Sequence, residues 1–576
     1  MSTSDAIDAL LRRFHADALV AVSDDVPAGR GMVLKKDIEP NSIVFHVPGN
    51  ALLNVKTIAD SLHEDLLPTA TRPSARQGIK VPFNPDQMPS FSSTHHIAAM
   101  HALDSQLELP LSSVQALCLL LTLWRRWDLE DHAPSKPDSF PSQALVDFAR
   151  TLPSEFATVP LLWSLMRDMS GSEGKLSRAL LSSLPAHSLQ RLEDVKARFF
   201  GDFHVVRSIL IHRPELLPGW ASAPTVEESS SDQLLSFFYW SWMCVNSRCL
   251  YLPLGLKTHE DNFTLAPLEY KVEYPPAGGM QIVAPKSDRK AFNLKTVRRD
   301  NGDVQVEEEW QKGCRASDEM FITYGPHSNE FLLSEYGFTL SIVSTQDDEL
   351  NLATNPYADV VVDDLVLEHL ATQPLVQAEL KRELLRERSY WLDWTIHPTG
   401  EPSHRLVCAL RLLVLNLAPS KEQMGATVAA LGHKSSKRLK LQHQSGKRSV
   451  SIPAAKQDAS SQTAPDLANI GDWEAMVSGS RESVSELNEQ LARELLIRIC
   501  GKVKERSQTK RDLLDGAFQD LLAAQTTGDA ARFEQGPASS RAGLIQSYEI
   551  VRMLLIEQAR IAQIVSDTTN STTEPW

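Results

Sequence analysis

The sequence predicts an α+β protein in which a β-containing N-terminal domain, interrupted by a helical insertion, precedes an all-α C-terminal domain. Three observations lead to this prediction. Strand-like segments lie on both sides of a long helical stretch, and the last third of the chain carries almost only helical patterns. The chain also has 576 residues, more than one hydrophobic core can hold. We therefore expect two folded domains.

The N-terminal strands are predicted from β-branched and aromatic residues between turn formers, as in residues 42–48, Ser-Ile-Val-Phe-His-Val-Pro. From about Leu111 to Leu217 the pattern becomes helical, with an amphipathic stretch at 179–200. One predicted helix in this region places four apolar side chains on a single face: Leu117, Leu120, Leu121 and Trp124. A further helix is predicted at 234–243, and strand-like residues return at 320–324.

The C-terminal third is predicted to be a helical bundle. Its core is expected along two stripes: Leu487, Leu491, Leu495 and Ile499, then Leu544, Tyr548, Val551 and Leu555. The stripes span too few heptads to favour a coiled-coil partner. Residues 434–466, rich in Ser, Lys and Gln, are predicted to form a disordered loop. Basic residues within it, at 437–440 and 447–448, fit either a nuclear-import signal or a solvated loop.

The composition argues against several classes of protein. The net charge of −15 disfavours non-specific binding to nucleic acid and favours a basic partner. The longest apolar run is too short to span a bilayer, and the N-terminus lacks the features of a signal peptide. The six cysteines are scattered, which predicts neither a metal site nor a disulfide framework. We expect a soluble monomer in the nucleus, the cytoplasm or both, with no membrane or nucleic-acid partner.

Three ordered motifs indicate the chemistry. The first is residues 29–38, Gly-Arg-Gly-Met-Val-Leu-Lys-Lys-Asp-Ile, followed by the strand that ends at Pro48. The second is residues 240–248, ending in Val-Asn-Ser-Arg, and then a Leu-x-Pro sequence at 265–267. The third, residues 318–338, is the most specific. In it, two Tyr-Gly pairs twelve residues apart enclose Ser-Asn and Leu-Leu, an arrangement hard to obtain by chance.

Together the motifs resemble those of SET-domain protein-lysine methyltransferases of the Rubisco large-subunit methyltransferase-like branch, in the fungal ribosomal-protein form. Residues 390–397 and 402–413 are similar to the helical substrate-binding domain of that branch. The resemblance implies a SET domain at 20–345, with its helical insertion at about 66–235, and a substrate-binding domain at 346–570. It also implies S-adenosylmethionine as the methyl donor and a basic non-histone protein, such as a ribosomal protein, as the substrate.

The resemblance assigns catalytic roles to two tyrosines. Tyr324 would stand at the catalytic centre, and Tyr336 would line the channel that admits the substrate lysine. The protein would align the amine with the methyl group and exclude water, with no metal required. A related branch methylates histidine, so lysine as the acceptor follows from the resemblance and not from the residues themselves.

Five residues are assigned to the cofactor. Gly29, Arg30 and Gly31 would form the turn beside the methyl donor, where glycine lets the backbone approach without a Cβ in the way. Arg248 would hold the cofactor carboxylate through a charge-assisted contact, although by itself such an arginine is more often part of a surface ion pair. Phe338 would stack near the adenine.

One stretch departs from the pattern. Where the family has Asn-His after Leu-x-Pro, this chain has Glu273 and Tyr274, and a carboxylate cannot replace an amide donor. Residues 271–314 also match poorly, as a divergent insertion or a gene-model error would explain. Three hypotheses follow: an active methyltransferase, a SET-fold module that binds a basic protein without turnover, and a helical scaffold without a cofactor. The three ordered motifs argue against the third.

Overall fold

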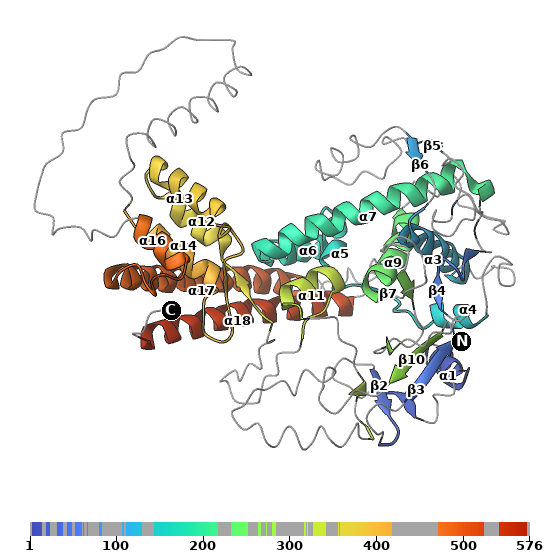
Figure 1. The fold of residues 1–576 in the computed structure, drawn as a ribbon. Coiled ribbons are helices and arrows are strands. Elements are labelled where there is room, and N and C mark those ends of the chain that lie inside the picture. The colour runs from blue at the N-terminus through green and yellow to red at the C-terminus, as the bar shows by residue number, and fades with distance from the viewer. Residues whose placement is uncertain are drawn as a thin grey trace, which may run out of the picture. The chain divides into compact units, whose positions relative to one another are not determined.

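The computed structural model describes residues 3–13, 19–23, 31–37, 43–48, 52–59, 62, 66, 80–82, 106–108, 111–129, 143–216, 232–251, 263–265, 272–273, 279–283, 316–317, 319–320, 326–340, 355, 357–416, 470–523, 541–572 and 576 (Figure 1). The chain divides by its contacts into two compact units. Unit 1 comprises residues 1–357 and 512–554, and unit 2 comprises residues 358–511 and 555–576. Helices and short strands are both present, so the fold is mixed α and β with extensive helical regions.

The strands of unit 1 are short and antiparallel. They are β1 (Val20–Ser23), β2 (Gly31–Leu34), β3 (Ile43–Pro48), β4 (Leu53–Asn54), β5 (Lys80–Pro82), β6 (Gln106–Glu108), β7 (Cys249–Tyr251), β8 (Phe263–Leu265), β9 (Val272–Glu273), β10 (Gly279–Val283) and β11 (Glu319–Met320). They form small sheets with the orders β1-β2-β11, β3-β10-β9, β4-β8-β7 and β5-β6. The strand predicted at 42–48 is thereby confirmed as β3.

Unit 1 is otherwise helical. Its helices are α1 (Thr3–Arg13), α3 (Ser113–Leu129), α4 (Gln143–Ala149), α5 (Pro160–Met166), α6 (Ser172–Ser183), α7 (Ala186–His212), α9 (Asp232–Arg248) and α11 (Asn329–Tyr336), with a 3-10 turn, η6, at Pro214–Leu216. The four apolar side chains predicted to be buried on α3 are buried, but so is every other residue from Ala116 to Trp124, so this part of the helix is buried on all sides. The predicted helix at 234–243 continues to Arg248.

Helices α3, α7 and α9 pack against one another around an aromatic core (Figure 1). Phe199 on α7 stacks on Phe203 and makes an edge contact with Trp242 on α9. The carboxylate of Asp202 lies between the three helices. It accepts hydrogen bonds from the indole of Trp242 at 2.9 Å and from the amide of Gln115 at 3.0 Å. Burial raises the pKa of Asp202, and these two donors satisfy its oxygens within the core.

Unit 2 is a helical assembly with one small β-pair. Its elements are β12 (Val360–Val361), α12 (Asp363–Ala371), α13 (Leu375–Glu387), β13 (Thr395–Ile396), α14 (His404–Leu413) and α16 (Ile470–Val477), while α17 (Glu486–Ala523) and α18 (Arg541–Ser571) have residues in each unit. Trp394 and Trp473 are fully buried in its core. The indole of Trp473 donates to the carbonyl of Cys408 on α14 at 2.9 Å.

Two details of the predicted helices are wrong. The stretch at 179–200 is divided into two helices, because α6 ends at Ser183 and α7 begins after Pro185, a residue that lacks the N–H needed to continue a helix.

The apolar stripe predicted on α17 is not buried at its start, where Leu487 and Leu491 are 46% and 36% exposed. A four-residue repeat advances by 400° and so drifts about 40° round the helix at each step. The buried face instead passes through Asn488, Ala492, Leu495, Leu496 and Ile499.

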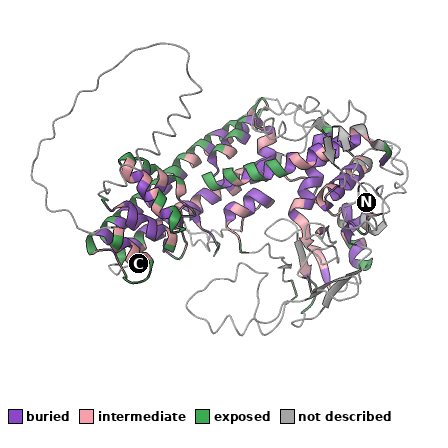
Figure 2. Ribbon diagram, turned by 45° about the horizontal axis from the view of Figure 1, so that its top comes forward, coloured by how far each residue is buried: buried purple, intermediate pink, exposed green. Residues whose placement is uncertain are grey.

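The burial pattern follows the amphipathic sequence elsewhere. Long helices carry buried residues along one side and exposed residues along the other (Figure 2). On α18, Leu544, Val551 and Leu555 are buried as predicted, and the ring of Tyr548 stacks on Phe518 at a centroid distance of 3.9 Å. None of the described helices is both long and apolar enough to span a bilayer. The predicted loop at 434–466 lies outside the described residues.

Candidate functional site

Arg248 is positioned by a direct helix-to-strand junction. It is the last residue of α9, and β7 begins at the next residue, Cys249. Strand β7 pairs with β8, with Cys249 opposite Leu265, so the structure brings the two parts of the second motif together. On the other side of β8, Leu53 of β4 also lies opposite Leu265. The arginine is thus attached to a three-stranded sheet built from distant parts of the sequence.

The first and third motifs meet in another sheet. Gly31 is the first residue of β2, which pairs with β11, where Met320 lies opposite Met32 and Glu319 opposite Val33. Because the strands are antiparallel, β11 runs toward the end of β2 at which Gly31 lies. Gly29, Arg30 and Tyr324, which flank these strands in sequence, lie outside the described residues.

The third motif forms helix α11 with a cap at each end. Ser328 is the N-cap, and its hydroxyl accepts a hydrogen bond from the N–H of Phe331. Gly337 follows the last helical residue, Tyr336, with a φ of +81°. Its N–H donates to the carbonyls of Leu332 and Leu333, which closes the helix in the conformation that glycine adopts most readily. Serine and glycine in the motif therefore set the length of α11.

The asparagine of the third motif, Asn329, has a structural role that the sequence alone did not reveal. Its side chain is buried, and its Oδ1 accepts a hydrogen bond from the N–H of Leu340 at 2.9 Å. The amide of Asn355 donates to the same oxygen at 3.4 Å and to the carbonyl of His327 at 2.8 Å. Asn329 and Asn355 together thus tie the chain on both sides of α11, and Asn329 holds the segment that follows Phe338.

Tyr336 and Phe338 lie together at the end of α11. Their rings are stacked, with centroids 6.2 Å apart and an interplanar angle of 22°. Phe331 meets Tyr336 edge-on at 6.1 Å and stacks on His327 at 4.0 Å. Aromatic side chains therefore gather at this helix end, which suits a dry channel for a planar or alkyl group.

The phenol of Tyr336 stays neutral at ordinary pH. Burial raises its pKa above the usual value, and the carboxylate of Glu335 raises it further, while Arg198 and Arg191 act in the opposite direction. A neutral phenol can both donate and accept a hydrogen bond. Tyr336 therefore has the protonation state needed to orient an amine.

The helices that carry Arg248 and Tyr336 are joined by a hydrogen bond. Helix α9 packs against α11, and the side-chain amide of Asn246 donates to the backbone carbonyl of Glu335 at 3.1 Å. Asn246 precedes Arg248 by two residues, and Glu335 directly precedes Tyr336. The structure thus connects two of the predicted site residues, although the sequence separates them by 88 positions.

The guanidinium of Arg248 contains a buried donor. Its Nε is buried and has no hydrogen-bond partner among the described residues. Leaving a buried charged donor unsatisfied is costly, so such a group is normally paired with an acceptor. A carboxylate brought by a bound molecule would satisfy it, and this chemistry fits the cofactor assigned to the site.

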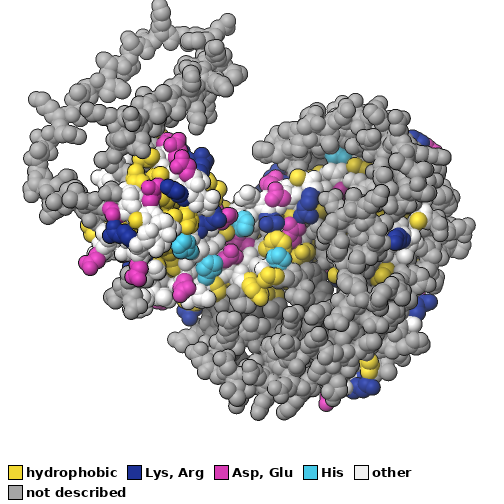
Figure 3. All heavy atoms as spheres, in the orientation of Figure 1, with side chains coloured by type: hydrophobic (Ala, Val, Ile, Leu, Met, Phe, Trp, Pro, Cys, Tyr) yellow, Lys and Arg dark blue, Asp and Glu magenta, His cyan; other side chains and the backbone are white. Residues whose placement is uncertain are grey.

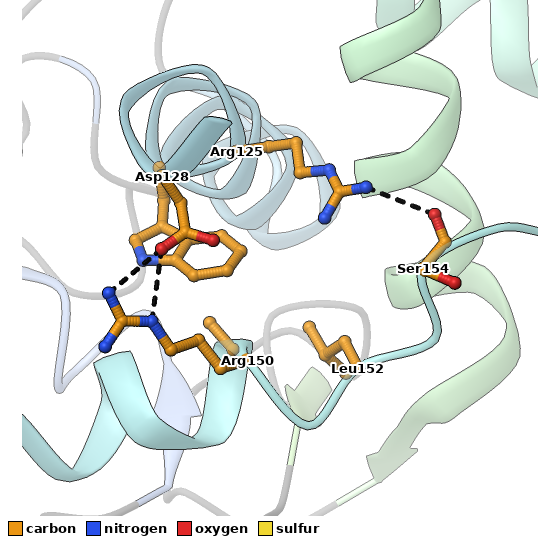
Figure 4. Close-up of a pocket in the computed structure, with 7 residues that line it drawn as sticks. Arg125, Asp128, Arg150, Leu152 and Ser154 are labelled. Atoms are coloured by element: carbon orange, nitrogen blue, oxygen red, sulfur yellow. Dashed lines mark hydrogen bonds and ion pairs between the residues drawn. The ribbon is translucent and has the colours of Figure 1, made fainter. Parts of the chain in front are cut away.

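A polar cleft elsewhere in unit 1 contains none of the predicted site residues. It has a volume of about 370 Å³ and is lined by α3 residues and by the segment from Ala149 to Ser154. Figure 4 shows Arg150 pointing to Asp128 and Arg125 pointing to the carbonyl of Ser154. The arginines that line the cleft therefore already have hydrogen-bond partners within it. The sequence did not predict this cleft.

Charged groups are mixed on the face shown in Figure 3, where Lys and Arg side chains alternate with Asp and Glu side chains over the described helices. Within the described part of the chain, no group of three His, Cys, Asp or Glu side chains is arranged to hold a metal ion. Glu273 lies in β9 opposite Gln281 of β10, so part of the stretch that departs from the family pattern takes part in a sheet. Tyr274 lies outside the described residues.

No family model matches the chain. A curated relative, ribosomal lysine N-methyltransferase 2 of Saccharomyces cerevisiae, is 24% identical over 430 residues, covering 70% of this chain and 80% of the relative. SET domain-containing protein 4 of Mus musculus is 31% identical over 194 residues, covering 32% of this chain and 37% of the relative. A solved structure of the SET domain of LSMT bound to lysine and AdoHcy is 13% identical, with a TM-score of 0.44, covering 99% of this chain and 92% of that one.

These relatives confirm the resemblance that the three motifs predict. The chain is similar over most of its length to a ribosomal lysine N-methyltransferase, and over about a third of its length to a SET domain-containing protein. The match extends over most of the yeast relative but over little more than a third of the mouse relative.

Proposed function

We propose that the chain is an S-adenosylmethionine-dependent protein-lysine N-methyltransferase that acts on a basic non-histone protein, with a ribosomal protein as the first candidate. The observation that carries the proposal is the buried Nε of Arg248, which lacks a hydrogen-bond partner among the described residues. It lies on α9, which is hydrogen-bonded to the α11 helix end where Tyr336 and Phe338 stack. A donor for a carboxylate and a cluster of aromatic rings thereby lie on two helices that a hydrogen bond joins.

Each proposed site residue has a distinct task. Arg248 would hold the carboxylate of S-adenosylmethionine, with Gly29, Arg30 and Gly31 forming the turn beside it. Phe338 would contact the adenine. The bound S-adenosylmethionine supplies an electrophilic methyl group. Its positive charge fits a site that presents aromatic faces, since cations are attracted to such faces.

The protein must also bind the substrate lysine with its amine in the neutral form. A lysine side chain has a pKa of about 10.4 in water, so most of it is protonated at neutral pH and cannot attack. Tyr336 would line a dry aromatic channel that disfavours the charged form and lowers the pKa of the substrate lysine. The hydroxyl of Tyr324 would then orient the amine for in-line attack.

The finer architecture is part of the same proposal. Residues 20–345 would form the SET domain, with its helical insertion at about 66–235, and residues 346–570 would form the substrate-binding helical domain. A net charge of −15 favours a basic substrate. We place the protein in the cytoplasm or nucleus as a monomer.

Calorimetric titration of the full chain with S-adenosylmethionine tests the cofactor site. We expect saturable binding, weakened at least about tenfold by Arg248→Ala, because a charge-assisted hydrogen bond contributes about 1.5 to 3 kcal/mol. Arg248→Lys keeps the charge but loses the planar fork and should be intermediate. Arg178→Ala removes only an exposed contact to the carbonyl of Arg167 and is the matched control, expected to bind normally.

Transfer of a labelled methyl group to purified ribosomal proteins tests the reaction. We expect label on lysine, with Tyr324→Phe and Tyr336→Phe both lowering the rate. Failure of the folded parent chain to bind S-adenosylmethionine would overturn the proposal. Binding without transfer to any basic protein would instead favour the alternative of a SET-fold binding module, which the replacement of Asn-His by Glu273 and Tyr274 first suggested.

A further inference from the structure

A cluster of four polar side chains links three helices directly behind Tyr336. Arg198 on α7 donates to Oδ1 of Asn246 on α9 at 2.9 Å and to Oε2 of Glu335 on α11 at 2.7 Å. Arg191, two turns earlier on α7, approaches Oε1 of Glu335 at 3.5 Å. Asn246 completes the circuit by donating to the backbone carbonyl of Glu335. Glu335 is thus held through both its side chain and its backbone.

Glu335 is the buried centre of this cluster. Its side chain is 9% exposed, whereas those of Arg191 and Arg198 are 33% and 48% exposed. Each arginine also lies over an aromatic ring, Arg191 over Phe331 at 4.6 Å and Arg198 over Trp242 at 5.7 Å. Because the arginines pack on rings of α11 and α9, their positions are restricted before they meet the carboxylate.

This arrangement controls the spacing of two proposed site residues. Glu335 is the neighbour of Tyr336 in the last turn of α11, and Asn246 is half a turn from Arg248 in the last turn of α9. A change in the Glu335–Asn246 link would shift one helix end against the other. Displacements of about 1 Å at a reacting centre can lower a rate about 100-fold.

We propose that Glu335 is a positioning residue: with Arg191, Arg198 and Asn246 it fixes the helix end that carries Tyr336 against the helix end that carries Arg248, so that the substrate amine and the methyl donor are aligned. The inference rests on the proposed function of this site. Glu335 acts through Tyr336 and does not itself meet the substrate.

The charge of Glu335 supports the same role. Its carboxylate is the second cause, after burial, of the raised pKa of Tyr336. Glu335 therefore helps to keep the neighbouring phenol neutral, while the two arginines balance its own charge. Glutamine at this position would keep the volume and one acceptor but lose the charge.

Steady-state methyl transfer by Glu335→Gln in the full chain tests the inference. We expect kcat to fall about 10- to 100-fold, since alignment is lost, while the calorimetric affinity for S-adenosylmethionine changes less than about threefold. Glu193→Gln is the matched control, because Glu193 lies on α7, has a side chain that is 56% exposed and pairs with Lys196, which is not part of the cluster. It should leave kcat unchanged.

A double-mutant cycle separates positioning from a general loss of folding. Asn246→Ala breaks the backbone link but leaves the carboxylate with its arginines, and we expect it to lower kcat. Combined with Glu335→Gln, it should cost less than the sum of the two separate losses, because both changes loosen the same junction between α9 and α11. Thermal unfolding is measured for every variant to confirm that the fold is retained.

The outcomes distinguish the two proposals. An active parent chain whose kcat is unaffected by Glu335→Gln would overturn the positioning role alone. A fall in activity that only matches the fraction of unfolded protein, or one that is additive in the cycle, would do the same. A parent chain that neither binds S-adenosylmethionine nor transfers methyl would overturn the proposed function, and the positioning role with it.

Discussion

Gly337 lies so close to Val159 that there is no room for a side chain between them. A Cβ built on Gly337 would be 2.6 Å from Cγ2 of Val159 and 3.0 Å from Oγ1 of Thr158. Gly337 also has a φ of +81°, in the left-handed region. The glycine of the Tyr-Gly-Phe sequence is therefore required twice, by the backbone conformation and by the packing of α11 against the start of α5.

We predict that Gly337→Ala destabilises unit 1 by about 2 to 4 kcal/mol, because the left-handed conformation and the overpacking each cost about 1 to 2 kcal/mol. Denaturant unfolding measures the loss. Gly479→Ala is the control, since Gly479 has a φ of +77° but nothing within 4 Å of its added Cβ. It should show only the backbone cost. In a Val159→Ala background, Gly337→Ala should cost less, and an equal cost would contradict the packing argument.

The local structure of α11 is encoded in the third motif. Ser328 and Gly337 are capping residues at fixed distances from each other, and Tyr336 and Phe338 follow from the same pattern. The link between Asn246 and Glu335 was not predictable, because the two residues are 89 positions apart and neither stands out from its neighbours. Such contacts arise from the packing of α9 on α11, which periodicity alone does not specify.

Helices and strands long enough to show a periodic apolar pattern were predicted, and strands too short to show one were not. Helix α3 has an apolar face of several turns, and β3 has six residues. By contrast, β4 and β9 have two residues each, too few to show a two-residue alternation. The break at Pro185 was visible in the sequence, but the apolar pattern continues across it and conceals the change of helix.

The buried ion pair of unit 2 gives a second prediction. Nη2 of Arg411 donates to Oε2 of Glu489 at 2.9 Å, and Nε lies 2.6 Å from Oε1, although not aligned as a hydrogen bond. The two side chains are 3% and 10% exposed. We predict that Arg411→Met destabilises unit 2 by about 3 to 5 kcal/mol, because it leaves Glu489 buried and unpaired.

Replacing both partners should restore much of this loss. In the Arg411→Met, Glu489→Met double variant no unpaired charge remains in the core, and denaturant unfolding should show a stability near that of the parent. The exposed pair of Arg506 and Asp364, each 44% exposed, is the control. Arg506→Ala should cost less than about 1 kcal/mol. A large loss in the double variant would show that the pair contributes a net stabilisation.

Lys381 gives a third prediction, on pH. Its side chain is buried, and its Nζ donates to Gln373 and to the carbonyl of Leu413, the last residue of α14. Burial lowers the pKa of Lys381 from 10.5 to about 8. Between these two values the unfolded chain binds more protons than the folded chain, so stability rises with pH. The difference between the folded and unfolded pKa values of Lys381 corresponds to at most about 3 kcal/mol of folding stability, which is gained from about pH 8 to pH 10.5.

Lys381→Met removes this titration. We expect the stability of the parent relative to the variant, measured by denaturant unfolding in parallel, to increase from about pH 8 to about pH 10.5, the limits set by the two pKa values of Lys381. Using the difference between the two proteins cancels the titration of the other groups. A difference that stays constant over this range would show that Lys381 keeps its ordinary pKa in the fold.

The raised pKa of Tyr336 gives the last prediction, on the pH dependence of methyl transfer. The substrate amine must be neutral, so the rate should rise with pH from about 7 toward the pKa of the bound lysine, which the proposed channel holds below the value of about 10.4 in water. Burial and the carboxylate of Glu335 hold the pKa of Tyr336 above its ordinary value, so most of the phenol remains protonated up to about pH 10. Single-turnover rates should therefore show no decline caused by Tyr336 below about pH 10.

Glu335→Gln removes one cause of the raised pKa of Tyr336. Ultraviolet difference titration against a Tyr336→Phe reference should then detect the tyrosinate at lower pH in this variant than in the parent. A rate that falls below about pH 9, and whose fall Tyr336→Phe abolishes, would contradict the neutral phenol.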